Sequence, residues 1–255
     1  MIFDTHAHYD DDAFDEDREE LLAQLKAAGI ERVVNVGASI HSSHTTLDLI
    51  AKHDFLYGAI GVHPSETEEL NEEWMNWLEE KSNEKKVVAI GEIGLDYHWE
   101  EPARDIQKYW FIRQLDLARK VNLPVIIHSR DAAADTLEIM KEHGRDLGGV
   151  IHCFSYGSEM AREYLKMGYY LGIGGVVTFT NAKKLKEVVK ETPLDRIVLE
   201  TDCPYLSPVP NRGKRNSSLN LPYVVDMIAE LKGITTEEVM EKTWENAKAL
   251  YRMTE

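Results

Sequence analysis

The sequence of 255 residues has few cysteines and no long apolar run. Its two cysteines, Cys153 and Cys203, do not suggest a disulfide framework, so we expect free thiols buried in the core of a cytoplasmic protein. No segment approaches the about 18–20 apolar residues that span a membrane, and the N-terminus lacks the basic and then apolar stretches of a secretory signal. We therefore expect a protein that does not associate with a membrane.

Positive charge is also scarce. The chain has 29 Lys and Arg against 45 Asp and Glu, which gives a formal net charge of −16. Such a surface argues against general, non-specific binding of a polyanion, although it permits a local cationic site. A glycine-rich dinucleotide fingerprint is absent as well, because Gly91 and Gly94 have the wrong spacing and context. The hydrophobic fraction of 43% is ordinary for a globular protein with a sizeable core.

Short β-branched runs alternate with amphipathic helical stretches along the whole chain. We predict eight strands, at residues 2–6, 32–37, 55–63, 87–92, 124–128, 149–153, 169–174 and 196–201. Helices are predicted at residues 15–28, 43–53, 66–82, 103–121, 132–143, 158–167, 182–189, 219–231 and 236–251. Eight βα units in a chain of this length predict a (β/α)8 TIM barrel, formed as a single domain over residues 1–255. An open doubly wound sheet is the alternative.

Two predicted helices begin with the pattern of a capping box. Ser65 with Glu68 fits the start of the third helix, and Thr235 with Glu238 fits the start of the last. In such a box the hydroxyl accepts a backbone hydrogen bond and the acidic side chain returns one. These patterns indicate structure and no function.

Metal-ligand residue types stand where several predicted strands end. The segment Asp-Thr-His-Ala-His at residues 4–8 places two histidines on one face of an extended strand. In a barrel the carboxyl ends of all strands meet at the active-site face, so ligands from different strands converge there. His63, after the third strand, lies at the same level. The candidate metal ligands are His6, His8, Glu92, His128, His152 and Asp202.

This ligand set narrows the choice of metal. Four imidazoles and two carboxylates suit Zn²⁺, Mn²⁺, Fe²⁺, Co²⁺ or Ni²⁺ better than Ca²⁺. Six ligands exceed the need of one tetrahedral ion, and a pair of cations sharing a carboxylate explains the number better. We therefore expect two divalent cations per chain, with Zn, Mn, Mg, Ni and Co as candidates.

Several motifs resemble the TatD family of metal-dependent hydrolases, within the amidohydrolase-like superfamily. They are Phe-Asp-Thr-His-Ala-His (3–8), Ile-Gly-Val-His-Pro (60–64), Gly-Glu-Ile-Gly-Leu-Asp-Tyr (91–97), Gln107 and Gln114, Ile-His-Ser-Arg-Asp (127–131), His-Cys-Phe-Ser (152–155), Glu-Thr-Asp-Cys-Pro-Tyr-Leu-Ser-Pro (200–208) and Asn246-Ala247. The resemblance runs from Phe3 to about Tyr251. It implies a TIM barrel, divalent metals and nuclease activity, often of the 3′→5′ exonuclease type. It also implies that the six candidate ligands bind metal and that Glu92 bridges two ions.

The sequence departs from the usual family pattern at two places. Tyr156 separates His-Cys-Phe-Ser from Gly157, and residues 217–222 replace the Glu-Pro that often follows Asn216. Both changes fall in loops expected at the active-site face, where substrate preference is set. The strand-four position is Glu92, where many relatives in the wider superfamily carry a carboxylated lysine. This favours a phosphoesterase over a cyclic amidase.

The expected reaction is hydrolysis by a metal-activated water, with Glu92 and Asp202 as catalytic residues. Asp202 would orient the water and accept its proton. Arg130 shares a face with His128 and can reach a phosphate, while Tyr205 can stack on a base. Alternative roles for these two residues are a surface salt bridge and loop packing. The expected substrate-binding residues are His63, Arg130, Glu200, Tyr205, Arg212, Lys214 and Arg215.

Two of these expectations carry alternatives of their own. Glu200 shares a face with Asp202, and it fits a hydrogen-bond partner, a ligand of a third ion or one half of a buried ion pair. The loop at residues 212–215 carries three cations after the eighth strand, where barrel enzymes often bind phosphate. The alternative for this loop is a solvated basic turn.

The natural substrate stays open at this stage. DNA, RNA or a small phosphodiester fits the expected reaction. The rival enzyme is a metal-dependent amide or ester hydrolase, such as a D-aminoacyl-tRNA deacylase, and the non-enzymatic rival is a metal-binding scaffold. The physiological metal is also open, and we expect a monomer or a weak oligomer.

Overall fold

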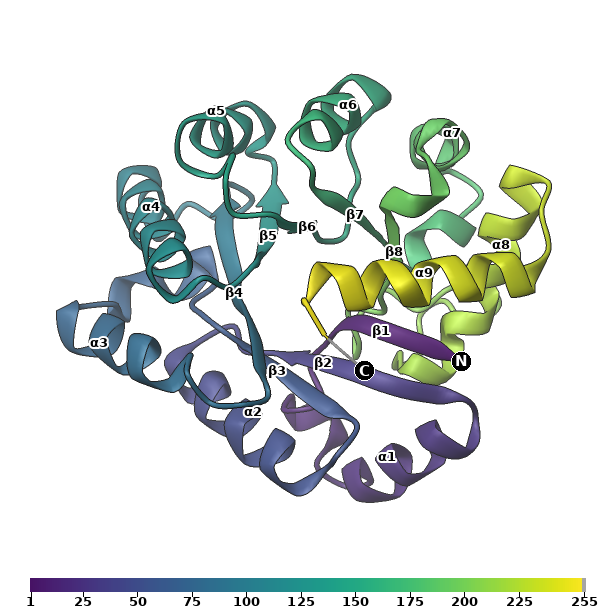
Figure 1. Ribbon diagram of the computed structural model, residues 1–255, viewed down its shortest axis with the longest axis horizontal. Helices are drawn as coiled ribbons and strands as arrows, with labels where there is room; N and C mark the ends of the chain where they lie inside the picture. Colours follow the sequence, from purple (N-terminus) through teal and green to yellow (C-terminus); the bar gives the residue numbers. More distant parts are fainter. Residues whose placement is uncertain (254–255) are drawn as a thin grey trace.

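Eight parallel strands form the centre of the molecule and follow one another in chain order around the sheet. The structure is a computed structural model that describes residues 1–253 (Figure 1). The strands are β1 (Ile2–Ala7), β2 (Ile30–Val36), β3 (Leu56–Ile60), β4 (Val87–Asp96), β5 (Val125–Arg130), β6 (Gly149–Ile151), β7 (Tyr170–Ile173) and β8 (Ile197–Leu199).

The sheet closes on itself between its first and last strands. The segment after β8 runs beside β1, where Ala7 and Cys203 form a parallel bridge. The backbone N–H of His8 donates to the carbonyl of Cys203 at 2.9 Å, and that of Asp202 donates to the carbonyl of His6 at 3.0 Å. The predicted barrel is therefore confirmed, and the open doubly wound sheet is wrong.

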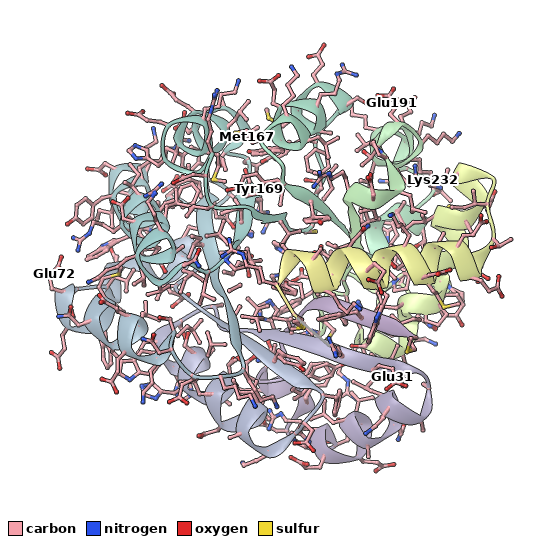
Figure 2. The ribbon with its side chains drawn as sticks, in the orientation of Figure 1. Glu31, Glu72, Met167, Tyr169, Glu191 and Lys232 are labelled. Atoms are coloured by element: carbon pink, nitrogen blue, oxygen red, sulfur yellow. The ribbon has the colours of Figure 1, made fainter. Side chains whose placement is uncertain are left out.

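Helices surround the barrel, and along the chain they alternate with its strands (Figure 1). They are α1 (Arg18–Ala27), α2 (Ile40–Lys52), α3 (Glu72–Lys81), α4 (Arg104–Val121), α5 (Ala133–His143), α6 (Ser158–Lys166), α7 (Lys183–Glu191), α8 (Leu221–Lys232) and α9 (Thr236–Leu250). Side chains fill the space between these helices and the sheet, while Glu72 and Glu191 lie at the periphery (Figure 2). Within residues 1–253, no helix is long and apolar enough to cross a membrane.

The last helix covers the amino end of the barrel. Tyr251, directly after α9, donates its hydroxyl to the carbonyl of Thr5 at 2.7 Å, and Trp244 packs on Phe3 with ring centroids 5.7 Å apart. The C-terminal part of α9 belongs to the same buried cluster as the residues inside the barrel: Phe3, Val34, Val36, Ala59, Val88, Ala89, Ile126, Val150, Val198, Ala247, Leu250 and Tyr251. This packing blocks the amino end, so a site has to form at the carboxyl end.

The third predicted helix starts later than expected. Residues 64–69 form a 3₁₀ helix, and α3 begins after Asn71, whose side chain accepts the N–H of Trp74 at 3.0 Å. The predicted capping box at Ser65 is therefore wrong, because the Ser65 hydroxyl contacts the His63 ring instead, at 2.8 Å. The box formed by Thr235 and Glu238 at the start of α9 is confirmed.

Strand β4 is longer than expected and shapes the mouth of the barrel. It continues past the predicted end at Glu92 to Asp96, and its register places Gly94 beside His128 on β5. Gly94 has φ of +150°, and a Cβ there would collide with the carbonyl oxygen of His128. A glycine is needed at this position, because only glycine allows two strands to approach so closely in this conformation.

Candidate metal centre

Glu92 lies at the centre of the barrel mouth, and one of its carboxylate oxygens faces the histidines of β1. Oε2 lies 3.4 Å from Nε2 of His6 and 3.7 Å from Nε2 of His8. Asp202 approaches from the other side, with Oδ1 3.6 Å from His6 and 3.4 Å from His8. Two imidazoles and two carboxylates thus converge on one point.

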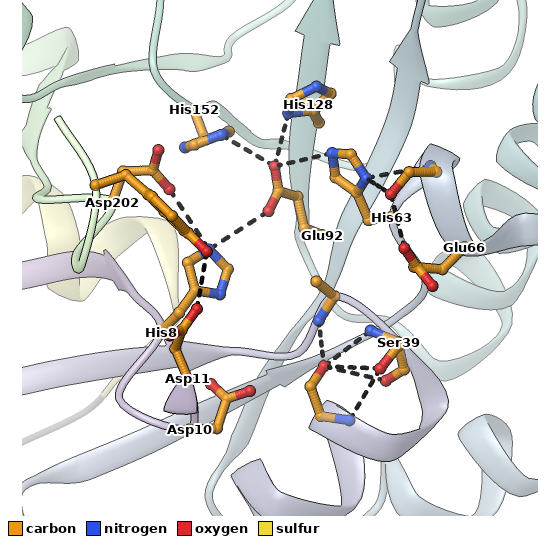
Figure 3. Close-up of a pocket in the computed structure, with 14 residues that line it drawn as sticks. His8, Asp10, Asp11, Ser39, His63, Glu66, Glu92, His128, His152 and Asp202 are labelled. Carbon is orange, nitrogen blue, oxygen red and sulfur yellow. Dashed lines mark hydrogen bonds and ion pairs between the residues drawn. The ribbon is translucent and has the colours of Figure 1, made fainter. Parts of the chain in front are cut away.

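The second carboxylate oxygen of Glu92 faces another group of histidines (Figure 3). Oε1 lies 2.8 Å from Nδ1 of His128 and 3.0 Å from Nε2 of His152, while Nε2 of His63 lies at 4.0 Å. The His128 and His63 rings meet edge to face with centroids 4.2 Å apart. A single buried carboxylate therefore divides its two oxygens between two separate sets of nitrogens.

The strands explain why these side chains converge. His6 and His8 lie two residues apart at the end of β1, so they share a face of that extended segment. Val36, at the end of neighbouring β2, has its carbonyl 2.7 Å from Nδ1 of His8. Nδ1 must carry a proton to donate to this carbonyl, which leaves Nε2 free to bind a metal.

The short contacts between carboxylates and imidazoles determine the charge states of Glu92 and His8. Burial disfavours an ionised Glu92, but the charge of His152 and the hydrogen bonds with His128 and His152 hold its pKa well below its usual range. Burial also disfavours a charged His8, yet its hydrogen bond with Asp202 and the nearby carboxylates raise its pKa to about 9. In the metal-free centre, Glu92 is therefore ionised and His8 is protonated, whereas burial and the charge of His152 lower the pKa of His6.

His63 differs from the other histidines of the centre. Burial and the charge of His128 lower its pKa to about 3, so its ring is neutral at neutral pH. The backbone N–H of Ser65 donates to its Nδ1 at 3.2 Å. Since Nδ1 accepts, the proton lies on Nε2, which points toward Glu92. His63 therefore presents an N–H donor to the centre.

The centre opens into a cavity of about 380 Å³ at the carboxyl end of the barrel. The rim carries three carboxylates that the sequence analysis did not single out, Asp10, Asp11 and Glu66, and the Tyr205 hydroxyl donates to Asp11 at 2.8 Å. The residues that line the cavity are His8, Asp10, Asp11, Ala38, Ser39, Ser42, His63, Ser65, Glu66, Glu92, His128, His152, Asp202 and Tyr205.

The six expected ligands form clusters that can hold divalent metal. Their candidate ligand atoms, joined in one group by Nε2 or Nδ1 of His63, make three overlapping groups within 4.8 Å: His6, His152 and Asp202; His6, His8 and Glu92; and His63, Glu92 and His128. Mixed imidazole and carboxylate donors suit first-row transition metals. Glu92 belongs to two of the groups, as expected of a ligand shared by two ions.

The basic loop after β8 does not line the cavity, although its three cations were expected to bind substrate. Arg215 forms a bidentate ion pair, including a contact of 2.7 Å, with Asp17, the residue directly before α1. Arg212 stacks on the ring of Phe179, with its guanidinium carbon 4.3 Å from the centroid. Lys214 is exposed on the same loop. Two of the three cations therefore have partners within the fold.

The other expected substrate residues also differ in position. Tyr205 lines the cavity and is 56% exposed, so one face of its ring is accessible. Arg130 is exposed at the end of β5 but lies outside the cavity lining. Glu200 is buried behind His152, with Oε1 3.5 Å from Nδ1 of that ring, and it accepts the N–H of Cys153. Glu200 therefore contacts His152 and does not reach the cavity.

The sequence analysis missed two buried carboxylates that support the centre. Asp96 lies 3.1 Å from Nε2 of His128, and its pKa is lowered because hydrogen bonds with His128 and His98 outweigh burial. Asp4 lies beneath the centre and accepts the hydroxyls of Thr201 and Ser218. Strand parity could have indicated both, because Asp4 shares a face with His6, and Asp96 shares a face with Glu92.

A family model described as TatD related DNase matches residues 3–252. The chain belongs to the TatD family. Its curated relatives in this family are metal-dependent hydrolases. The chain is 51% identical over 254 residues to the uncharacterized metal-dependent hydrolase YabD of Bacillus subtilis (strain 168), covering 99% of this chain and 100% of the relative. It is 36% identical to the uncharacterized metal-dependent hydrolase YcfH of Escherichia coli (strain K12), covering 99% and 96% of the two chains.

Solved structures of this family share the fold. The crystal structure of YjjV, a TatD homolog from Escherichia coli K12, superposes with a TM-score of 0.93 at 30% identity, covering 99% of this chain and 98% of YjjV. A hydrolase TatD family protein from Entamoeba histolytica superposes with a TM-score of 0.88 at 26% identity, covering 99% and 98% of the two chains. The protein is thus a TatD-family, metal-dependent hydrolase with a TIM barrel fold.

Proposed function

We propose that this TatD-family hydrolase cleaves phosphodiester bonds, acting on DNA as a 3′→5′ exonuclease with two divalent cations. The observation that carries the proposal is the division of the Glu92 carboxylate between two groups of imidazoles, at 2.8–3.0 Å from one and 3.4–3.7 Å from the other. A carboxylate shared in this way suits hydrolysis assisted by two metals. The family description, TatD related DNase, supports nucleic acid as the substrate.

The six ligands divide into two sets around the shared carboxylate. We assign His6, His8 and Asp202 to one cation, and His128 and His152 to the other, with Glu92 as the ligand of both. When bound, the cations acidify a water toward neutral pH and neutralise charge on the phosphoryl oxygens. Activity after reloading with Zn, Mn, Mg, Ni or Co separately identifies the metal.

Asp202 is the residue we assign as general base. Burial disfavours its ionised form, but the hydrogen bond from His8 and the charges of His152 and His6 lower its pKa, so it is a carboxylate at neutral pH. It lines the cavity and is 19% exposed at its side chain, so it can accept a proton from a water held beside it.

His63 and Tyr205 are the residues we assign to the substrate. The Nε2–H of His63 can donate to a phosphoryl oxygen, because its Nδ1 is occupied by the Ser65 N–H. The ring of Tyr205 stands at the rim and can stack on a terminal base, a contact worth about 1–3 kcal/mol in single-strand binding.

Digestion of end-labelled single-stranded DNA tests this proposal. The protein is stripped with a chelator, reloaded with each candidate metal and incubated with 5′-labelled and 3′-labelled strands. We expect mononucleotides released from the 3′ end only after reloading. Metal binding without turnover of DNA, RNA or a small phosphodiester would reject the nuclease and leave the ester hydrolase and the metal-binding scaffold as the alternatives.

A metal-dependent ester hydrolase is the second candidate, and the charge of the cavity favours it. Among residues 1–253, the cavity lining includes no lysine or arginine, while Asp10, Asp11 and Glu66 place carboxylates at the rim. Such a rim suits a substrate with a cationic group, such as the ammonium of an aminoacyl ester. Release of a D-amino acid from D-aminoacyl-tRNA, in a reloaded sample that leaves DNA intact, would establish this alternative.

A further inference from the structure

A carboxylate of β4 supports His128 from the side of the ring opposite Glu92. Oδ2 of Asp96 lies 3.1 Å from Nε2 of His128, while Nδ1 of the same ring lies 2.8 Å from Oε1 of Glu92. The side chain of Asp96 is only 4% exposed. The His128 ring is therefore held between two buried carboxylates, of which only Glu92 lines the cavity.

Asp96 is itself fixed by the loop and helix that follow β4. The backbone N–H of His98 donates to Oδ1 of Asp96 at 2.9 Å, so this oxygen is already used as an acceptor. Gln107 on α4 binds the backbone of Asp96 from both sides, since it accepts the N–H and donates to the carbonyl, each at 2.9 Å. The remaining oxygen, Oδ2, therefore has a defined position beside His128.

A neutral imidazole carries one proton, and the partner of one nitrogen decides where that proton lies. A carboxylate oxygen only accepts, so Asp96 favours a proton on Nε2, and Glu92, at 2.8 Å, favours one on Nδ1. When a metal takes the place of the proton on Nδ1, Asp96 keeps the remaining proton on Nε2, as a metal ligand needs. We propose that Asp96 is the positioning residue that fixes this tautomer of His128 and thereby determines metal affinity beside Oε1 of Glu92.

The substitution Asp96→Asn distinguishes this role from simple packing. The atom that faces the His98 N–H has to remain an oxygen, so the amide NH₂ of the asparagine turns toward His128. It then donates to Nε2 and moves the ring proton to Nδ1, where it competes with a metal. The shape and volume of the side chain hardly change, so packing is preserved.

The inference rests on the proposed metal centre and not on the nature of the substrate. The matched control is Asp131→Asn, because Asp131 is exposed and lies 3.5 Å from His98 without contacting His128. Both variants and the parent are titrated with Zn²⁺ in competition with a chromophoric chelator, and thermal unfolding of the metal-free proteins reports folding. Loss of such an indirect partner of a metal ligand typically costs about 10–100-fold in affinity.

We expect Asp96→Asn to bind one of two Zn²⁺ equivalents about 10–100-fold more weakly than the parent and than Asp131→Asn. In the Zn²⁺-loaded parent, ¹⁵N NMR of the imidazoles should show the His128 proton on Nε2, and in metal-free Asp96→Asn at alkaline pH the proton should lie on Nδ1. A loaded parent with no proton on Nε2, a metal-free Asp96→Asn with its proton on Nε2, or equal affinities in all three proteins overturns the inference. If the parent binds no Zn²⁺, the metal centre is wrong, and the spectrum of metal-free Asp96→Asn still tests the effect of residue 96 on the tautomer.

Discussion

The substitution Glu92→Gln tests the centre most directly. It replaces the shared carboxylate by a neutral amide of the same shape. One oxygen remains, whereas the NH₂ group turns donor protons toward one of the two sets of imidazoles. The variant therefore loses one unit of negative charge and one of the two acceptors at the point where His6, His8, His128 and His152 converge.

The distances set the size of the effect. The oxygens of Glu92 lie 2.8–3.7 Å from the four imidazole nitrogens, so cations held by these rings also lie close to the carboxylate. Unit charges about 3 Å apart interact by about 5 kcal/mol at an effective dielectric constant of about 20, which corresponds to three to four powers of ten. The remaining amide oxygen offsets part of this loss, so we expect kcat/KM to fall at least about 100-fold.

The assay is the steady-state hydrolysis of a chromogenic phosphodiester, with metal content measured on the same samples. The control is Glu66→Gln, which neutralises a carboxylate at the exposed rim and should change kcat/KM less than about fivefold, since exposed charge contacts are worth up to about 1 kcal/mol. A Glu92→Gln enzyme with two metals and kcat/KM within about tenfold of the parent would refute the shared-ligand role.

Three further predictions concern the same end of the barrel. The double variant His6→Ala, His8→Ala should keep its fold by circular dichroism but lose at least one of two metal equivalents, and full metal content would reject the ligand assignment. Metal affinity should rise with pH up to about 9, by up to about tenfold per pH unit, because metal binding displaces the proton that His8 holds below its raised pKa. Calorimetry in buffers of different ionisation enthalpy measures this proton release, and a release of zero protons contradicts the prediction. Arg215→Ala should lower the urea concentration at the midpoint of unfolding only slightly, because its ion pair with Asp17 is partly exposed. A changed KM for oligonucleotides with an unchanged midpoint would instead support a role of Arg215 in substrate binding.

The sequence predicted the barrel and the convergence of the six ligands for a simple reason. Side chains two apart on a strand share a face, and parallel barrel strands all present their carboxyl ends on one side. His6 and His8 on β1 are two such residues, and the structure brings them beside Glu92. The capping box at Thr235 was also predicted correctly, because it depends only on residues three apart in the chain.

Contacts between distant segments were decided only by the tertiary structure. The hydroxyl of Ser65 contacts His63, and Asn71 caps the start of α3 instead. This difference depends on where β3 ends. Arg215 forms an ion pair with Asp17, 198 residues earlier in the chain, a partner that the sequence did not indicate. A side chain binds the partner that packing places nearest, and periodicity along one strand or helix carries no information about that partner.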